Sequence, residues 1–350
     1  MNIFDLKNNK YISDNLNLVI NDNGIMKNLY YCFNNISISY LKTLEKKLIK
    51  AAFDNLSDKE IIYIIVDWIK GTKDSHYVKF KLSYNEYIDL KIEESIGFIK
   101  DDKSLVNNIH LDIGAGDCAL SFLIGERLKM KSFGVDIDTE IDWSGDSKDD
   151  PCKGRKILYD GTNIKDVNKI LIKKFKIKKP IIGLCTYNHS IHHFGSFDNI
   201  ETSIKQVSRL LKMGGYILFR EHNIHNNLDN YHINLQHILL FIRYTYDKTK
   251  GIDEFIKLYR KFIDEFTSNY FGNKYIEQVC SKNKLKLIYK KKRIIPEPIN
   301  KKELIKNGIN PDEDISKTYL YIFKKIKSET ESKNKTKKKN KKKTKTKKAT

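Results

Sequence analysis

Glycines and carboxylates gather in the stretch from residue 108 to residue 138. A short apolar strand at 109–113 leads into Gly114 and Gly116, apolar residues then recur at helical spacing, and a second short strand ends in Asp136. Glycines at such a turn let the backbone approach a ligand closely, and the first turn of the following helix offers unpaired N–H groups. A carboxylate at the end of the second strand can accept hydrogen bonds from ribose hydroxyls. The pattern therefore predicts the nucleoside-binding half of an α/β fold.

The same glycines also satisfy a dinucleotide fingerprint. Gly114, Gly116 and Ala119 occupy its three positions, with alanine in the last, and Asp136 follows about twenty residues later, as the fingerprint requires. Taken alone, this motif is compatible with an NAD-linked oxidoreductase. Residues further along the chain are needed to separate the two interpretations.

Histidines follow a third strongly apolar segment. A strand is predicted at 180–185, the sequence TYNHSIHHFGSF comes after it, and an amphipathic helix is predicted at 199–211. The sequence KMGG then turns into a strand at 216–219, which ends in Arg-Glu-His at 220–222. Ligands bind outside the carboxyl ends of the strands in open α/β sheets, so we expect the histidines and the glutamate to lie at the same edge as the glycine turn.

Two segments resemble class I S-adenosylmethionine-dependent methyltransferases. The run LDIGAGDCALS resembles their motif I, in which a carboxylate just before the glycines, here Asp112, helps to hold the methionine part of the cofactor. The order of strand, His-His-Phe, helix, Arg-Leu-Leu-Lys-x-Gly-Gly and strand is similar to the second half of small members of this family, and NAD dehydrogenases do not usually show it. The family often has a third glycine where this chain has Cys118. The resemblance covers about residues 100–225, and within it the ending ILFREHN is similar to methyltransferase-like proteins of large DNA viruses.

The resemblance implies a Rossmann-like class I methyltransferase fold, an α/β architecture with a seven-stranded, mostly parallel sheet and helices on both faces. It implies S-adenosyl-L-methionine as the cofactor and methyl transfer to an acceptor that the sequence does not identify. The resemblance implies that the methionine moiety of the cofactor binds to Asp112, Gly114, Ala115 and Gly116. It implies that the ribose binds to Asp136, with Asp138 close by, and the adenine to Asp160.

The candidates for a catalytic base are His189, Glu221 and His222. Methyl transfer from a sulfonium is an in-line displacement on an activated carbon, so the protein mainly aligns the two reactants and excludes water. A base is needed only when the acceptor is a poor nucleophile that carries a proton, and packing around the pocket is the alternative role for the histidines. Clustered with His192 and His193, these residues could ligate a metal, but no Cys or carboxylate spacing supports it, and we predict no metal site.

Arg220 follows the predicted strand at 216–219, and the sequence suggests two partners for its side chain. One is the neighbouring Glu221, and the other is an acidic substrate. The sequence does not separate them.

The positive charge of the chain is concentrated near its end. The formal net charge is +21 at pH 7, and the stretch from Lys324 to Thr350 holds fourteen Lys and two Glu, which supply +12 of it. Such a tail can bind nucleic-acid phosphates without sequence preference, serve as a targeting signal, or have no partner. It contains no aromatic residue on which a base could stack, so it offers no sequence specificity. The charge favours RNA or a nucleic-acid-associated protein over a metabolite as the acceptor.

Pattern and composition divide the chain into three parts. Residues 1–100 are predicted to form a helical N-terminal extension, 101–325 a methyltransferase domain with a helical insertion at about 224–271, and 326–350 a disordered Lys-rich tail. The resemblance adds an antiparallel hairpin at the edge of the sheet, with strands at 284–295 and 317–323.

The N-terminal extension contains three clear helical patterns. Helices are predicted at 30–50, 57–71 and 84–99, and the second begins with a capping box formed by Ser57 and Glu60. Residues 1–30 are expected to be partly ordered at best. We expect the extension to pack as a cover on the sheet.

Between residues 138 and 156 the chain becomes strongly polar. Its acidic residues match no Ca²⁺-binding loop, so a long solvated loop is predicted there, followed by a third strand at 157–160.

Cysteine usage and hydropathy bear on the compartment. The five cysteines are widely spaced, with no CxxC, which is typical of a reducing intracellular compartment and gives no support to a zinc site. The first ten residues lack the apolar core of a signal peptide, and the apolar run at 61–69 is too short to span a bilayer. We therefore expect a soluble, intracellular and cytoplasmic protein, with a viral or nuclear location left open.

Two alternatives to a methyltransferase enzyme stay open from the sequence. The first is a non-catalytic binding protein that keeps the methyltransferase fold as a partner subunit. The second is the NAD-dependent oxidoreductase, which the segments around His192 and Gly214 disfavour. The oligomeric state and the atom that is methylated are not specified by the sequence.

Overall fold

The computed structural model describes nine stretches of the chain. They are residues 10–78, 84–116, 118–136, 156–158, 164–178, 181–265, 268–293, 301–313 and 315–327. Of the predicted polar loop at 138–156, all but Lys156, which begins β3, lies outside these residues, as do Asp138, Asp160 and the greater part of the Lys-rich tail.

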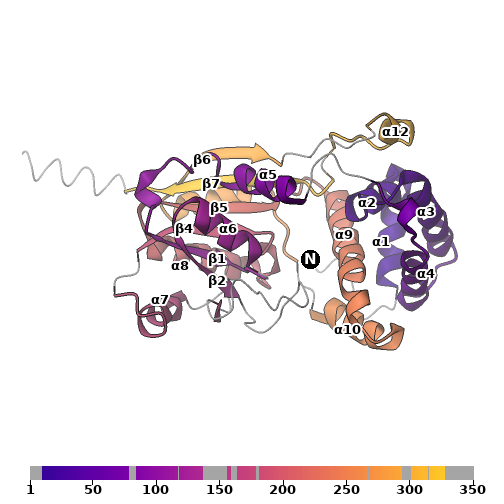
Figure 1. The fold of residues 1–350 in the computed structure, drawn as a ribbon, viewed down its shortest axis with the longest axis horizontal. Helices are drawn as coiled ribbons and strands as arrows, with labels where there is room; N and C mark the ends of the chain where they lie inside the picture. The colour runs from indigo at the N-terminus through magenta and orange to yellow at the C-terminus, as the bar shows by residue number, and fades with distance from the viewer. Residues whose placement is uncertain are drawn as a thin grey trace, which may run out of the picture.

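The centre of the molecule is a seven-stranded sheet with the strand order β3-β2-β1-β4-β5-β7-β6. The first five strands pair in parallel, whereas β7 runs antiparallel to both β5 and β6. The predicted seven-stranded, mostly parallel sheet with an antiparallel hairpin at its edge is therefore confirmed (Figure 1). The strands are β1 Ile109–Ile113, β2 Lys131–Asp136, β3 Lys156–Leu158, β4 Ile182–Asn188, β5 Leu211–His222, β6 Leu285–Lys292 and β7 Thr318–Lys325.

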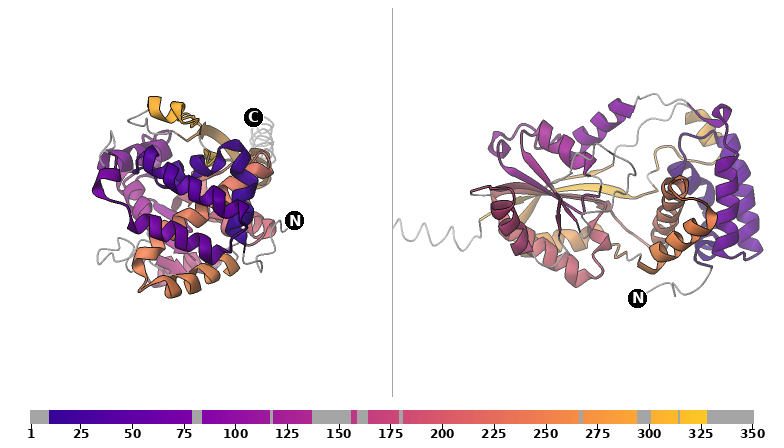
Figure 2. Two further views of the ribbon diagram at one scale, coloured as in Figure 1. Left: turned by 90° about the vertical axis from the view of Figure 1, so that its right-hand side faces the viewer. Right: turned by 60° about the horizontal axis from the view of Figure 1, so that its bottom comes forward.

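Both faces of the sheet are covered by helices, as the nearly continuous apolar sequences of β1 and β4 require. Successive side chains of a strand point to opposite faces, and on β5 Tyr216 and Leu218 join one apolar core while Ile217 and Phe219 join the other. One face is covered by α5 Tyr84–Ile96 and α6 Ala119–Arg127. The other is covered by α7 Ile164–Lys173, α8 Phe197–Leu210 and α11 Asn273–Lys282 (Figures 1 and 2).

A second group of helices lies beside the sheet rather than on it, and we call it the helical body (Figure 1). It has its own apolar core, separate from the two cores of the sheet. Its members come from two separate parts of the chain, the N-terminal helices and the segment after β5: α1 Tyr11–Val19, α2 Gly24–Cys32, α3 Ile38–Phe53, α4 Asp58–Lys70, α9 Asn227–Thr245 and α10 Ile252–Glu265. The insertion after β5 thus supplies α9 and α10, and α9 packs against α1, α2 and α4 on the side of the helical body that faces the sheet (Figure 1).

The start of the chain differs from the sequence prediction. Residues 1–30 were expected to be partly ordered at best, but α1 and α2 are packed helices, and Ile12, Leu16 and Leu29 are fully buried. The reason is tertiary: their apolar faces meet α9, about two hundred residues further along the chain. The same contacts explain why the N-terminal helices do not cover the sheet as expected, since only α5 does so.

A buried carboxylate fastens this helical body internally. Asp58, at the start of α4, accepts hydrogen bonds from the backbone N–H of Ile12 (2.7 Å) and from the hydroxyl of Tyr259 on α10 (2.8 Å). Burial raises the pKa of the Asp58 carboxyl above its usual range. Three helices that are distant in sequence therefore share one buried polar contact.

The predicted capping box at the start of α4 is confirmed. The hydroxyl of Ser57 accepts the N–H of Glu60, and the Glu60 carboxylate accepts the backbone N–H of Ser57 (2.8 Å). These contacts satisfy two backbone donors that a helix start otherwise leaves without partners.

The remaining short elements connect these parts. They are α12 Lys301–Lys306 and the 3₁₀ helices η1 Ile20–Asp22, η2 Asp74–His76, η3 Lys103–Leu105, η4 Ile191–His193 and η5 Tyr246–Lys248. Among the described helices, none is long and apolar enough to cross a bilayer.

Candidate functional site

The glycine turn follows β1 directly, and its two glycines have different surroundings. Gly114 and Gly116 both adopt positive φ angles, +71° and +53°, which L side chains rarely take. A Cβ on Gly114 would clash with the side chain of Ser190, whereas a Cβ on Gly116 would have no atom of the described residues within 4 Å. Gly114 is therefore required for packing between the ends of β1 and β4. Gly116 has no such packing role among the described residues.

Asp136 reaches from the end of β2 to this turn. Its Oδ2 accepts the backbone N–H of Gly116 at 2.9 Å, while Gly114 donates its N–H to the carbonyl of Val135 at 2.7 Å. The carboxylate is partly buried and lies against the backbone of the turn. This is the placement expected of an acid that binds a ribose, and contact with a cofactor stays a prediction.

Asp112 is buried beneath the turn, inside a hydrogen-bond network. Its Oδ1 accepts from the hydroxyl of Thr186 (2.5 Å) and from the amide of Asn188 (3.1 Å), and its Oδ2 accepts from the hydroxyl of Ser121. Burial raises the pKa of the Asp112 carboxyl to about 6, although the three donors lower it. The side chain thus ties β1 to β4 and α6, and its predicted contact with the methionine moiety stays a prediction.

The network continues one step further into the sheet. His110 bonds through Nδ1 to the hydroxyl of Ser132 (2.9 Å) and through Nε2 to the hydroxyl of Thr186 (2.8 Å). Full burial lowers the pKa of His110 to about 3, so the ring is neutral at neutral pH. Three strands and one helix are joined by these buried contacts.

The other predicted cofactor residues have less defined positions. Ala115 lies in the turn, and its carbonyl accepts the N–H of Cys118 at 2.9 Å. Cys118, the residue that replaces a third glycine, adopts a positive φ of +58° and is disulfide-bonded, which differs from the reduced cysteines expected from the sequence. Asp160 lies outside the described residues.

The three candidate bases come together at the ends of β4 and β5. Ligand atoms of His189, Glu221 and His222 lie within 4.8 Å of one another. Glu221 is buried, accepts Nδ1–H of His192 at 2.6 Å and accepts the backbone N–H of His222 at 3.0 Å. Burial raises the pKa of the Glu221 carboxyl to about 6. The expected gathering of these side chains at one edge of the sheet is confirmed.

Arg220 has a partner that the sequence interpretation did not include. It forms an ion pair with Glu94 of α5 at 3.1 Å, and both side chains are 6% exposed. The contact fastens α5 to the middle of the sheet. Pairing of Arg220 with Glu221 was one of two expectations, but in the structure Glu221 is hydrogen-bonded to His192 instead.

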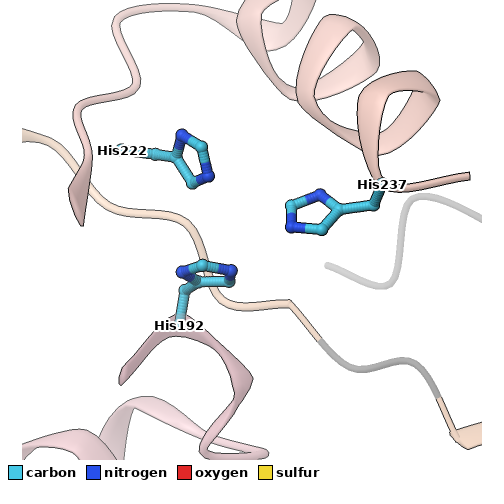
Figure 3. A group of neighbouring side chains, drawn as sticks. All are labelled: His192, His222 and His237. Carbon is cyan, nitrogen blue, oxygen red and sulfur yellow. The ribbon is translucent and has the colours of Figure 1, made fainter. Parts of the chain in front are cut away.

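One residue of the cluster could not be found by sequence reasoning. His237 lies on α9, and its ring centroid is 5.6 Å from that of His192 and 5.8 Å from that of His222. Figure 3 shows the three rings converging from η4, the end of β5 and α9. Because α9 belongs to the helical body, no local spacing in the sequence signals this contact.

Comparison with known proteins identifies no close relative. No protein-family model matches the sequence, and no curated protein matches it. The solved structures that the chain is similar to include an S-adenosylmethionine-dependent methyltransferase from Clostridium acetobutylicum, with 15% identity, a TM-score of 0.39, and coverage of 71% of this chain and 94% of that chain. A SAM-dependent methyltransferase from Methanosarcina mazei has 13% identity, a TM-score of 0.37, and coverage of 63% of this chain and 94% of that chain. Geranyl diphosphate C-methyltransferase from Streptomyces coelicolor has 12% identity, a TM-score of 0.38, and coverage of 76% of this chain and 86% of that chain.

The chain's own topology defines its fold class. The sheet order 3-2-1-4-5-7-6, the antiparallel seventh strand and the glycine turn after the first strand are found together in this molecule. These features give the chain the class I methyltransferase fold.

Proposed function

We propose that this protein is an S-adenosylmethionine-dependent methyltransferase. The observation that carries the proposal is the glycine turn, where Gly116 has a positive φ with no described residue near its Cβ position and donates its N–H to Asp136 at the carboxyl end of β2. When bound, the cofactor supplies a methyl group on a positively charged sulfur, a carbon already activated for displacement. The chain's own task is to hold that group in line with an acceptor and to exclude water.

Calorimetric titration with S-adenosylhomocysteine tests cofactor binding. We expect micromolar affinity for the wild-type protein and no binding of NAD. Asp136→Ala should weaken binding at least about tenfold, because it removes a charge-assisted acceptor. Asp136→Asn is the matched control: it keeps an acceptor for Gly116, so it separates support of the turn from contact with the ribose. Binding of NAD in place of S-adenosylhomocysteine would overturn the proposal, and absence of binding to both would favour a non-catalytic partner subunit.

His189 is the best placed of the three candidate bases. Its side chain is 32% exposed, whereas that of Glu221 is 1% exposed and His222 is buried. Its backbone has the unusual φ of +51°, a strained conformation of the kind that gathers at functional sites. Desolvation and, after it, nearby positive groups lower the pKa of His189 well below its usual value, which leaves the ring neutral.

The role of His189 is tested by the variant His189→Gln. With an acceptor that must lose a proton, we expect a loss of roughly 10²–10⁴-fold in turnover and unchanged affinity for S-adenosylhomocysteine. An equal loss with an acceptor that has no proton to lose would assign His189 a positioning role instead.

For the acceptor, we propose RNA or a nucleic-acid-associated protein. The support is the net charge of +21 and its concentration in the Lys-rich tail. A chain ending at Lys327 should bind RNA more weakly and with a smaller dependence on salt. Unchanged methylation and unchanged salt dependence in this shortened chain would exclude the tail as a nucleic-acid arm.

A further inference from the structure

The histidine cluster at the end of the sheet has the composition of a metal centre. We propose that His192, His222 and His237 bind one divalent transition-metal ion, with zinc as the leading candidate. The proposal stands on the geometry of this cluster and does not depend on methyl transfer.

The three rings are close enough to share an ion. One nitrogen from each lies within 4.8 Å of the others, and the ring centroids are 5.2–5.8 Å apart. Zinc binds imidazole nitrogen at about 2.1 Å, so three ligands of a tetrahedral ion lie roughly 3.4 Å from one another. Figure 3 shows the three rings close together, and small rotations of the side chains toward one another would bring the nitrogens to that separation.

The other nitrogen of each ring is already held by an acceptor. Nδ1–H of His192 donates to Glu221 (2.6 Å), that of His222 donates to the carbonyl of Ser316 (2.6 Å), and that of His237 donates to the carbonyl of Ile233 (2.8 Å). Metal-binding histidines in proteins almost always have such a partner, a carboxylate or a backbone carbonyl, which fixes the tautomer and the ring orientation. In all three residues it leaves Nε2 as the nitrogen whose lone pair can face an ion.

One of these nitrogens has no partner in the described part of the chain. His192 is fully buried, and its Nε2 makes no hydrogen bond with any described residue. Buried polar atoms without a partner are rare in native proteins because each costs free energy. An ion at the centre of the three rings would supply the missing partner.

The ligand set indicates which metal would bind. Three neutral imidazoles without a thiolate suit zinc and, next to it, iron(II), cobalt or nickel, and they do not suit magnesium or calcium. Three histidines with an open fourth position are also a known arrangement of catalytic zinc. Glu221 then acts on the metal indirectly, by orienting His192, in a carboxylate–histidine–metal arrangement.

A competing set shares one ligand with this site. His189, Glu221 and His222 also lie within 4.8 Å of one another and could hold an ion through the carboxylate. We favour the three-histidine set because it consists of imidazoles with fixed tautomers, whereas Glu221 is already engaged by His192 and by the backbone of His222. The experiment must therefore separate His237 from His189.

The test uses the full chain, produced without an affinity histidine tag and stripped of metal. Cobalt(II) serves as the spectroscopic probe, and zinc is then titrated calorimetrically. We expect one equivalent of metal with a Kd at or below the micromolar range. His192→Gln and His237→Gln should weaken binding at least 100-fold, whereas His189→Gln and the exposed His225→Gln should change it less than threefold. Circular dichroism of each variant checks that it has folded.

X-ray absorption of the zinc-loaded wild-type protein provides a second measurement that needs no variant. We expect three imidazole nitrogens in the first coordination shell. No stoichiometric binding to the wild-type chain would overturn the proposal. So would a shell with fewer than three imidazoles, or loss of binding in His189→Gln but not in His237→Gln.

Discussion

Two buried polar clusters lie at the same edge of the sheet, and they differ in how completely they are hydrogen-bonded. Beneath the glycine turn, both ring nitrogens of His110 and both carboxylate oxygens of Asp112 have partners, and among the described residues of this network only Oδ1 of Asn188 is buried without one. At the ends of β4 and β5, Nε2 of His192 and Oε2 of Glu221 have none among the described residues.

The difference indicates what each cluster is for. A network whose ring nitrogens and carboxylate oxygens are all paired holds strands in place, whereas one with an unpaired imidazole nitrogen and carboxylate oxygen contributes little to stability until a ligand or ion completes it. We therefore interpret the first cluster as a support for the glycine turn, and we infer that the second binds a ligand or ion.

The largest loss of stability is expected where the glycine turn packs against Ser190, after the end of β4. Gly114→Ala combines a positive φ with a clash against Ser190 and should lower the free energy of unfolding by about 3 kcal/mol or more. The control Gly116→Ala has positive φ but open space, so about 1 kcal/mol is expected. Urea unfolding measures both, and equal losses would contradict the different surroundings of the two glycines.

The same substitution in each cluster tests the comparison directly. His110→Leu removes two buried hydrogen bonds and should lower the free energy of unfolding by roughly 2–3 kcal/mol. In metal-free protein, His192→Leu removes one bond but also an unsatisfied nitrogen, so we expect a loss below about 1 kcal/mol. A loss at His192 as large as that at His110 would mean that the second cluster is structural as well.

The first cluster also predicts a dependence of stability on pH. The ring of His110 is neutral in the folded protein down to about pH 3, whereas an unfolded histidine takes up a proton near pH 6.5. The contribution of His110 to the free energy of unfolding is therefore complete above pH 6.5 and decreases as the pH falls. The decrease is at most about 1.4 kcal/mol per pH unit, so the contribution should be roughly 2 kcal/mol smaller at pH 5.

The carboxyls of Asp112 and Glu221, whose pKa is raised to about 6, change stability in the opposite direction. The measurement is therefore the difference in unfolding free energy between the wild-type protein and His110→Leu from pH 7.5 to pH 4.5. A difference that does not change with pH would exclude a buried neutral histidine at this position.

The smallest effect is expected far from both clusters. Ser57→Ala removes the cap of α4 and should cost about 1 kcal/mol of unfolding free energy. Affinity for S-adenosylhomocysteine and for zinc should not change, since the helix start contacts neither cluster. A loss of either affinity would show that the helical body affects the site through more than α9.

Local chemistry explains which features could be predicted from the sequence. The glycine turn and the capping box at Ser57 depend on residues close together in the chain, and the seven-stranded, mostly parallel sheet followed from the resemblance. The packed helices of the first thirty residues were missed because their apolar partners lie on α9, more than two hundred residues away. His237 was missed for the same reason, since only the folded chain brings it to His192 and His222.

Helix α9 takes part in two assemblies at once. Its Leu235, Ile238 and Leu239 belong to the core of the helical body, while His237 turns toward the end of the sheet. An ion held by His192, His222 and His237 would thus be a reversible cross-link between the helical body and the sheet. By thermodynamic linkage, whatever strengthens the docking of the two parts would tighten the hold on the ion by the same factor, and removing the ion would loosen the docking.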